Sequence, residues 1–176
     1  MRIIAGERKG HRIAAPRGEA TRPTGDRVRE AAFNLIGPVD DAVVLDLFAG
    51  SGAMGLEALS RGAARCTFVE SDRDACRTID ANLEKLRLNG ARVLRQDVRR
   101  FLAIEAGPYD LILVDPPYEL VESLAVPLST HLPRLLATDG IVILETSARQ
   151  EPELEALSVR TSRRYGSVRL TVFEHP

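Results

Sequence analysis

The sequence predicts an α/β fold with a mostly parallel sheet that ends in an antiparallel pair. Short apolar runs alternate with longer amphipathic segments over most of the 176 residues. Strands that are apolar on both faces are typical of a parallel sheet covered by helices. Near the end, two strand-like runs are joined only by Tyr165-Gly166-Ser167. Because that link is too short for a crossover helix, these two strands are expected to pair antiparallel.

The first residues predict a small extension of the main domain. Two short runs, Arg2–Ala5 and His11–Ala14, flank a charged link with glycine at both ends, which favours a β-hairpin. A linker containing glycine and proline follows. We therefore expect an N-terminal hairpin and linker over residues 1–23 and the main domain over residues 24–176.

The main domain is expected to begin with a helix that runs to about Ile36, with Thr24 and Asp26 as candidate caps. Further helices are expected at Ala53–Arg61, Asp72–Leu88 (capped by Asp72), Val98–Ala103, Glu119–Leu136 (interrupted by Pro127 and Pro133) and Glu151–Leu157. The expected strands are Val43–Leu47, Cys66–Val69, Val93–Arg95, Leu111–Val114, Ile141–Glu145, Ser158–Tyr165 and Val168–Phe173.

Composition excludes several classes of protein. A net charge of −1 excludes a polybasic protein that binds nucleic acid by charge alone, although residues 1–30 hold eight basic and four acidic residues. Two cysteines make neither a disulfide framework nor a four-ligand metal site, so we expect no metal. Without a signal peptide or an apolar run of about 18 residues, we expect a cytoplasmic monomer with no membrane partner.

A glycine loop follows the first strand of the main domain. Gly50, Gly52 and Gly55 match the G-x-G-x-x-G pattern, and Glu70 follows Gly50 by 20 residues, which is typical of dinucleotide binding. Asp46 favours a different ligand, because a carboxylate below the loop would repel a pyrophosphate and attract a cation. S-adenosylmethionine carries an ammonium group for Asp46 and ribose hydroxyls for Glu70. The candidate cofactor residues here are Asp46, Phe48, Gly50, Gly52, Glu70, Ser71, Asp97 and Val98, the last two near the adenine.

A second motif, Asp115-Pro116-Pro117-Tyr118, follows the strand Leu111–Val114 and should face the same crevice. Asp115 and the Pro116 carbonyl can each accept an N–H from a planar base that bears an amino group, and Tyr118 can stack on it. Two acceptors that aim the nitrogen lone pair at a methyl carbon make direct methyl transfer feasible. These four residues are the candidate catalytic residues.

With these motifs in this order, the chain resembles the class I S-adenosylmethionine-dependent methyltransferases. The opening resembles one family, the bacterial 16S ribosomal RNA guanine-N2 methyltransferases. The residues that carry this resemblance are Arg2-Ile3-Ile4-Ala5-Gly6, Lys9-Gly10, Arg22-Pro23-Thr24, Asp26-Arg27-Val28-Arg29-Glu30 and Phe33-Asn34.

The family resemblance implies a fold, a cofactor and a partner. It implies a Rossmann-like, seven-stranded sheet, S-adenosylmethionine as cofactor, and 16S rRNA in a partly assembled small ribosomal subunit as substrate. It also implies that Thr24 contacts the cofactor. The basic hairpin would touch RNA through Arg8, Lys9 and Arg12.

Three alternatives stay open. DNA adenine-N6 and protein glutamine methyltransferases use related Pro-Pro-aromatic motifs, although 176 residues leave no space for a sizeable DNA recognition domain. A nicotinamide-dependent oxidoreductase fits the glycine pattern but gives no role to Asp46 or to Asp115–Tyr118. An RNA-binding assembly factor on an inactive methyltransferase fold is disfavoured because every motif is intact.

Overall fold

The computed structural model describes residues 1–16 and 25–176. Its strands are β1 (Val43–Leu47), β2 (Arg65–Glu70), β3 (Ala91–Arg95), β4 (Tyr109–Val114), β5 (Leu136–Ser147), β6 (Ser158–Tyr165) and β7 (Val168–Glu174). Its helices are α1 (Asp26–Ile36), α2 (Ala53–Ser60), α3 (Arg73–Leu86), α4 (Val98–Ile104), the 3-10 turn η1 (Tyr118–Leu120) and α5 (Val121–Leu135).

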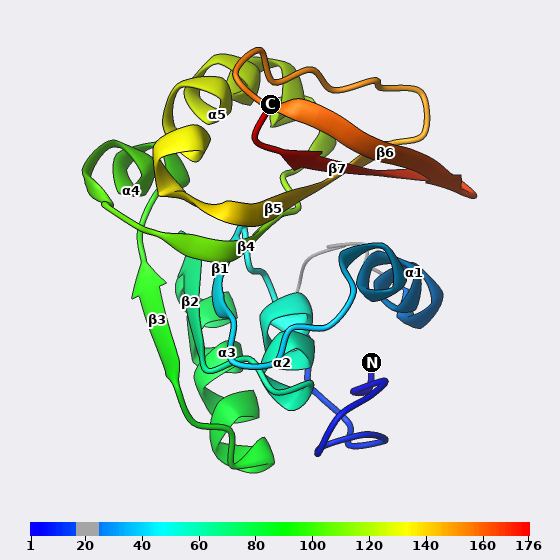
Figure 1. The fold of residues 1–176 in the computed structure, drawn as a ribbon. Coiled ribbons are helices and arrows are strands. Elements are labelled where there is room, and N and C mark those ends of the chain that lie inside the picture. Colours follow the sequence, from blue (N-terminus) through cyan, green and yellow to red (C-terminus); the bar gives the residue numbers. More distant parts are fainter. Residues whose placement is uncertain (17–24) are drawn as a thin grey trace.

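All seven strands form one sheet in the order β3-β2-β1-β4-β5-β7-β6 (Figure 1). The strands β1 to β5 are parallel to one another. The last strand, β7, is antiparallel to both β5 and β6. The predicted sheet with its terminal antiparallel pair is therefore confirmed.

Helices cover both faces of the sheet and bury two hydrophobic cores. The core under α1, α2 and α3 includes Val44, whereas the core under α4 and α5 includes Leu45 and Leu47. Because successive strand residues point to opposite faces, Asp46 lies on the same face as Val44, toward α2. The same alternation puts Asp115, just after β4, on the face of Leu113, which belongs to the α1–α3 core.

The N-terminal segment (residues 1–16) differs from the predicted hairpin. It forms one isolated antiparallel bridge, between Arg2 and Arg12, and no two-stranded ladder. Ile3 and Ile13 are buried in the α1–α3 core, so the segment packs into the main body. Its two halves share backbone hydrogen bonds, such as the Ile3 N–H to the His11 carbonyl at 2.9 Å. The pairing does not extend into a ladder, because the next N–H groups donate to side chains of α2 and α3. The expected domain boundary at 23/24 lies outside the described residues.

Two predictions about helices are wrong. Pro127 and Pro133 do not interrupt α5, which runs through both, because the leucines that it buries on the sheet continue past each proline and packing outweighs the lost hydrogen bonds. Residues 151–157 form no helix. The apolar pair Leu154 and Leu157, three apart as on a helix, instead anchors a coil to the α4–α5 core.

The predicted caps fare differently. Asp72 caps α3, and its carboxylate accepts the backbone N–H of Ala75 at 2.7 Å. The helix α1 has Gly25 at its N-cap with no side-chain cap. Asp26, the first residue of α1, pairs with arginines instead, and Thr24 lies outside the described residues.

Candidate functional site

The site lies at the carboxyl edge of the sheet. The strand order reverses direction at β1, which has β2 on one side and β4 on the other. Leu47 is paired with Val114, and the backbone N–H of Asp115 donates to the Leu47 carbonyl at 3.4 Å. The glycine loop and the Asp115–Tyr118 motif therefore begin side by side. In open α/β sheets, ligands bind at this kind of position.

The glycine loop turns sharply from β1 into α2. Phe48, Gly50 and Gly52 all have positive φ, at 60°, 53° and 76°, and a bulky residue such as Phe48 adopts that conformation only where the surroundings impose it. At Gly50 an added Cβ would meet nothing closer than the Phe48 carbonyl at 4.0 Å. The loop therefore leaves open space beside Gly50.

Gly55 serves packing. An added Cβ there would lie 2.3 Å from Cε1 of Phe68 and 2.7 Å from Sγ of Cys66. Only glycine lets α2 approach β2 this closely, which is the packing role of the third glycine in such loops.

Asp46 joins β1 to the start of α2. Its side chain is buried, with 3% of the residue exposed, and Oδ2 accepts the Gly55 N–H at 2.9 Å. Burial raises the pKa of Asp46 well above its ordinary value, the charges of Asp115 and Glu70 add to this rise, and the Gly55 hydrogen bond opposes it. The three carboxylates therefore interact electrostatically at one edge of the sheet.

Glu70 ties the loop to the neighbouring strand. One carboxylate oxygen accepts the Gly50 N–H at 2.9 Å, and the other accepts the Asp72 N–H at 2.8 Å and lies 3.4 Å from the Ser71 hydroxyl. The oxygen bonded to Gly50, Oε2, has a second lone pair that can accept a further hydrogen bond. Glu70 is thus held in a fixed orientation beside the loop.

Asp97 and Val98 lie at the next strand end. Asp97 caps α4, since its carboxylate accepts the Arg100 N–H at 3.1 Å. Its side chain is exposed, whereas Val98 is buried. The Gln96 N–H donates to the Glu70 carbonyl at 2.9 Å, so this turn lies directly beside the end of β2.

The Asp115–Tyr118 motif forms a rigid turn into η1. Asp115 and Tyr118 are half-buried, Pro116 is buried and Pro117 is exposed. The Pro117 carbonyl is not an open acceptor, because it accepts the Leu120 N–H at 2.9 Å. Among the described residues, no backbone donor reaches the Pro116 carbonyl.

Two amides that sequence reasoning missed support these loops. Gln150 accepts the Ser147 N–H at 3.1 Å and donates to the Tyr118 carbonyl at 3.4 Å. Asn82, on α3, donates to the Ser51 carbonyl of the glycine loop at 3.3 Å. Neither residue stands in a recognisable motif, because both reach the loops from distant parts of the chain.

The basic residues of the N-terminal segment divide into two groups. The guanidinium of Arg8 is used within the protein, where it donates to the Leu86 carbonyl and, at 3.3 Å, to the Arg87 carbonyl. It thereby completes the end of α3, a favourable place for a cation. Lys9 and Arg12 are exposed.

A buried ionic network, centred on Glu57 of α2, fixes the same segment. Its carboxylate accepts the Ile4 and Ala5 N–H groups at 2.8 and 2.9 Å and lies 2.8 Å from the guanidinium of Arg61 and 3.6 Å from that of Arg29. The side chains of Glu57 and Arg29 are fully buried.

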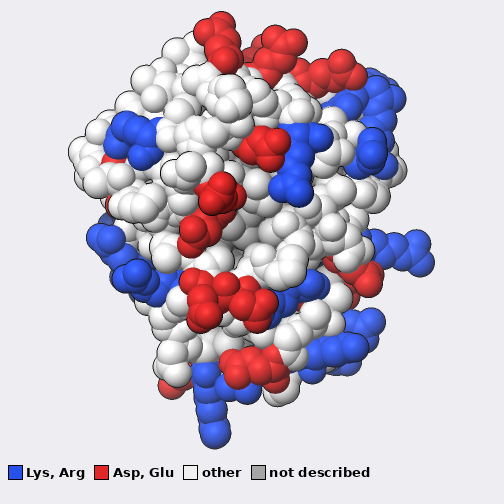
Figure 2. Space-filling model, in the orientation of Figure 1, with Lys and Arg blue, Asp and Glu red and all other residues white. Residues whose placement is uncertain are grey.

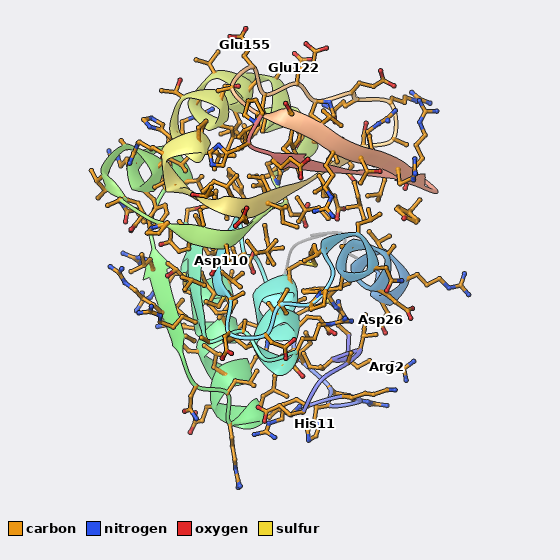
Figure 3. The ribbon with its side chains drawn as sticks, in the orientation of Figure 1. Arg2, His11, Asp26, Asp110, Glu122 and Glu155 are labelled. Carbon is orange, nitrogen blue, oxygen red and sulfur yellow. The ribbon has the colours of Figure 1, made fainter. Side chains whose placement is uncertain are left out.

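Asp26 extends this network toward the surface. It pairs with Arg29 at 3.0 Å and with Arg2 at 3.5 Å, and Figure 3 shows Arg2 and Asp26 next to each other. The network therefore connects the N-terminal segment, α1 and α2.

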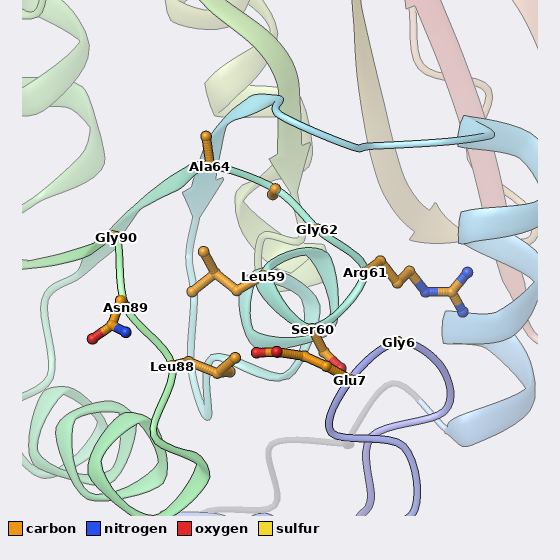
Figure 4. A pocket seen from close by; sticks show the side chains of 11 residues that line it. Gly6, Glu7, Leu59, Ser60, Arg61, Gly62, Ala64, Leu88, Asn89 and Gly90 are labelled. Atoms are coloured by element: carbon orange, nitrogen blue, oxygen red, sulfur yellow. The ribbon is translucent and has the colours of Figure 1, made fainter.

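Two hollows lie away from the candidate site. One, of about 530 Å³, lies at the far end of α2, with Gly6, Ser60 and Asn89 in its wall (Figure 4). The other, of about 430 Å³, lies at the amino edge of the sheet and is lined in part by acidic residues. Figure 2 shows acidic side chains gathered in the middle of one face, where Figure 3 labels Asp110. The acidic residues of this hollow are Asp40, Asp41, Asp110 and Asp139.

The carboxyl edge fits a cationic ligand. Asp46 of β1, Glu70 of β2 and Asp115, just after β4, interact electrostatically at this edge, near the open space at Gly50. A pyrophosphate would be repelled there, whereas an ammonium or sulfonium group would be attracted. These residues therefore suit S-adenosylmethionine better than a dinucleotide.

The described residues contain no group of three His, Cys, Asp or Glu side chains arranged to bind a metal ion. Within that same part of the chain, no helix has the length and apolar character needed to span a bilayer.

Comparisons with known proteins agree with this geometry. A family model described as Conserved hypothetical protein 95 matches residues 1–174. YlbH of Bacillus subtilis (strain 168) is 39% identical over 181 residues, which cover 99% of this chain and 98% of YlbH. Ribosomal RNA small subunit methyltransferase D of Escherichia coli (strain K12) is 46% identical over 119 residues, which span 67% of this chain and 60% of that enzyme.

The fold has a solved counterpart. The structure of yhhF from Escherichia coli matches with a TM-score of 0.85 and 35% identity and covers 99% of this chain and 97% of that one. The family resemblance predicted from the sequence is confirmed: the chain belongs to the Conserved hypothetical protein 95 family, together with YlbH and ribosomal RNA small subunit methyltransferase D.

Proposed function

We propose that this protein transfers a methyl group from S-adenosylmethionine to the exocyclic N2 amine of one guanine in 16S ribosomal RNA, on an assembling small ribosomal subunit. The observation that carries the proposal is the hydrogen bond between Asp115 and Leu47, which joins the two motifs at one sheet edge. Family membership and the 46% identity to ribosomal RNA small subunit methyltransferase D support the choice of RNA.

The cofactor end of the site uses charge and open space. When bound, S-adenosylmethionine supplies an activated methyl group on a positively charged sulfur. Asp46 attracts the ammonium group from below the loop, and Glu70 accepts from the ribose hydroxyls. Gly50 gives the ligand room beside the backbone. Asp97 accepts from the adenine amine.

The remaining cofactor assignments complete this pocket. The Val98 side chain offers an apolar contact for the adenine, and Ser71 lies next to Glu70. Phe48 and Gly52 hold the loop conformation through their positive φ angles. For Thr24, which lies outside the described residues, the family resemblance implies a cofactor contact.

The base end of the site orients the amine. Asp115 and the Pro116 carbonyl accept the two N–H groups, which directs the nitrogen lone pair to the methyl carbon. The ring of Tyr118 stacks on the base, and the rigid Pro116-Pro117 pair holds these groups in register. As the N–C bond forms and the C–S bond breaks, the amine loses a proton, which Asp115 accepts.

The RNA surface includes the N-terminal segment. Lys9 and Arg12 are exposed and contact phosphates of the ribosomal RNA. Arg8 contributes by holding this segment on the end of α3, so it acts as a positioning residue.

The same proposal includes a monomer in the cytoplasm. Among the described residues, the exposed large apolar side chains are scattered over separate elements, whereas a stable dimer needs a contiguous apolar patch. Light scattering on the purified protein would then give the mass of one chain, 19.3 kDa. A mass of two chains at micromolar concentration would overturn this part.

Methyl transfer itself is tested with small subunits from a strain that lacks this gene. Tritiated S-adenosylmethionine is the donor, and the RNA is digested to nucleosides after the reaction. The expected product is N2-methylguanosine, and it should be absent with Asp115→Ala. Label in N6-methyladenosine, or in protein alone, would overturn the proposal.

Calorimetry separates methyl transfer from nicotinamide chemistry. S-adenosylhomocysteine should bind, and NAD should not, because the three carboxylates at the sheet edge repel a pyrophosphate. Binding of NAD with no binding of S-adenosylhomocysteine would favour the oxidoreductase.

A further inference from the structure

Asn82 is a buried amide that joins two parts of the chain far from each other in sequence. It lies on α3, is 1% exposed, and makes three hydrogen bonds. Its Oδ1 accepts the Ala14 N–H at 2.8 Å, and its Nδ2 donates to the Ala14 carbonyl at 3.1 Å and to the Ser51 carbonyl at 3.3 Å. One side chain therefore holds both the N-terminal segment and the glycine loop.

Packing alone does not explain an asparagine at this position. Asn82 stands three residues after Ile79 and four before Leu86, both buried in the α1–α3 core, so it belongs to the buried face of the helix. An apolar residue would be the simplest choice there. Burying an amide costs free energy unless its polar atoms are hydrogen-bonded. The polar atoms of Asn82 are bonded to the N-terminal segment and to the glycine loop.

The hydrogen bonds of Asn82 hold both segments close to residues of the proposed site. Ser51 stands between Gly50 and Gly52, and the Gly50 N–H is bonded to Glu70. The loop is thus held on one side by Glu70 and on the other by Asn82. Ala14 belongs to the segment that carries Lys9 and Arg12.

We infer that Asn82 is a positioning residue that couples the glycine loop to the N-terminal segment. Through it, binding of the cofactor at the loop and binding of RNA at the segment strengthen each other. The inference rests on the proposed function, because it takes the loop as the cofactor site and the segment as an RNA contact. Such coupling is reciprocal by thermodynamic necessity. RNA held by the segment therefore tightens the loop around the cofactor.

The wild-type protein gives the first test. Hydrogen exchange of backbone amides is measured with and without saturating S-adenosylhomocysteine. The Ala14 and Ile13 amides should exchange more slowly with the ligand present, although they lie outside the cofactor pocket. If the ligand protects the loop but leaves these two amides unchanged, the coupling is overturned. If the ligand does not bind at all, the proposed function fails instead.

Two variants give the second test. Asn82→Leu keeps the branched shape of the side chain and removes all three bonds, and Asn82→Asp keeps the acceptor for the Ala14 N–H and loses both donated bonds. Each should weaken binding of S-adenosylhomocysteine about tenfold, within the span typical of coupled sites. Each should also abolish the ligand-induced protection of Ala14. The matched control is Asn89→Asp, on an exposed turn after α3, which should change neither quantity.

A purely structural role predicts a different result. It would lower the melting temperature and speed exchange in both states, yet keep the increment of protection that the ligand causes. That result in either folded variant overturns the inference. If both variants fail to fold, the wild-type exchange experiment decides alone.

Discussion

The backbone N–H of Gly50 donates to a carboxylate oxygen of Glu70 at 2.9 Å, so the acid at the end of β2 helps to shape the loop that follows β1. Glu70 therefore has two tasks in the proposed site. It fixes the loop through the protein's own N–H groups, and it presents its remaining lone pair to the ribose.

Replacing Glu70 by alanine should weaken cofactor binding. The loss of a charge-assisted hydrogen bond is worth about 1–3 kcal/mol, and calorimetry with S-adenosylhomocysteine measures it. Glu70→Gln keeps an oxygen for the Gly50 N–H and should fall between wild type and alanine. The exposed Asp74→Ala, on the first turn of α3, serves as the control. Equal affinity of Glu70→Ala and wild type would contradict the ribose assignment.

Replacing Asp115 by alanine should abolish methyl transfer and leave the cofactor affinity within about a few fold. The reason is that Asp115 orients the target amine, while the cofactor is held by the loop and by β2. Single-turnover assays with small subunits and calorimetry measure the two quantities separately. A variant with wild-type turnover would falsify the role of Asp115.

The raised pKa of Asp46 predicts a pH dependence. Burial first, and then the charges of Asp115 and Glu70, raise the pKa of Asp46 well above its ordinary value of 3.8, against the Gly55 hydrogen bond. Between the ordinary and the raised pKa, the folded protein keeps a proton on Asp46 that the unfolded chain has released. The free energy of unfolding therefore falls as pH rises from the ordinary pKa to the raised pKa. A cationic ligand favours the ionised form, so affinity for S-adenosylmethionine should rise over that window.

Asp46→Asn tests this linkage. Asparagine still offers an oxygen to the Gly55 N–H, so the loop should fold, while the ionisable group is gone. The pH dependence of stability and that of cofactor affinity should both become weaker in this variant. Urea denaturation and calorimetry at several pH values measure the two. A variant that keeps the wild-type pH slopes would show that another group titrates.

Reversing charge at the exposed end of the N-terminal segment should impair RNA contact alone. The double variant Lys9→Glu with Arg12→Glu should raise KM for small subunits and leave the binding of S-adenosylhomocysteine unchanged. Its defect should shrink as salt rises, because phosphate contacts are screened. Equal KM values for variant and wild type would remove this segment from the RNA surface.

Breaking the buried network at Glu57 should cost much stability. Glu57→Ala leaves the buried guanidinium of Arg29 with Asp26 as its remaining carboxylate and removes the acceptor of the Ile4 and Ala5 N–H groups. Breaking a buried ion pair typically costs about 3–5 kcal/mol. Urea denaturation measures the loss. The control is Arg77→Ala, which removes an exposed ion pair to Asp74 and should cost about 0–1 kcal/mol. Similar losses for both variants would mean that the buried pair contributes no more than a surface pair.

The sheet was predictable because its signals are local. The apolar run Val43–Leu47 indicates a strand that is buried on both faces, and the short link Tyr165–Ser167 requires that the two strands it joins pair antiparallel. The helix predicted at Glu151–Leu157 failed because Leu154 and Leu157 have helical spacing for a different reason, namely the anchoring of a coil. The helix break predicted at Pro127 was wrong for the opposite reason, because packing against the sheet overrides a local helix breaker.

The positions of the candidate site residues were predictable where these residues follow a strand end, as at Glu70 and Asp115. The partners that hold those groups were not. Asn82 reaches Ser51 across 31 residues, and Gln150 reaches Tyr118 across 32. The bond from Arg8 to the end of α3 likewise leaves no trace in the local sequence.

Exposed arginines lie around the carboxyl edge of the sheet, outside the three carboxylates of the candidate site. Asp40, Asp41 and Asp110 line the hollow at the amino edge together with Arg160, whereas Arg99, Arg100 and Arg149 are exposed near the carboxyl edge. A polyanion that diffuses toward the molecule is thus turned toward the carboxyl edge at distances of about 10 Å in 0.1 M salt. More of the encounters then start in the productive orientation, so the association rate constant is higher at low ionic strength. This increase is lost when salt screens the charges.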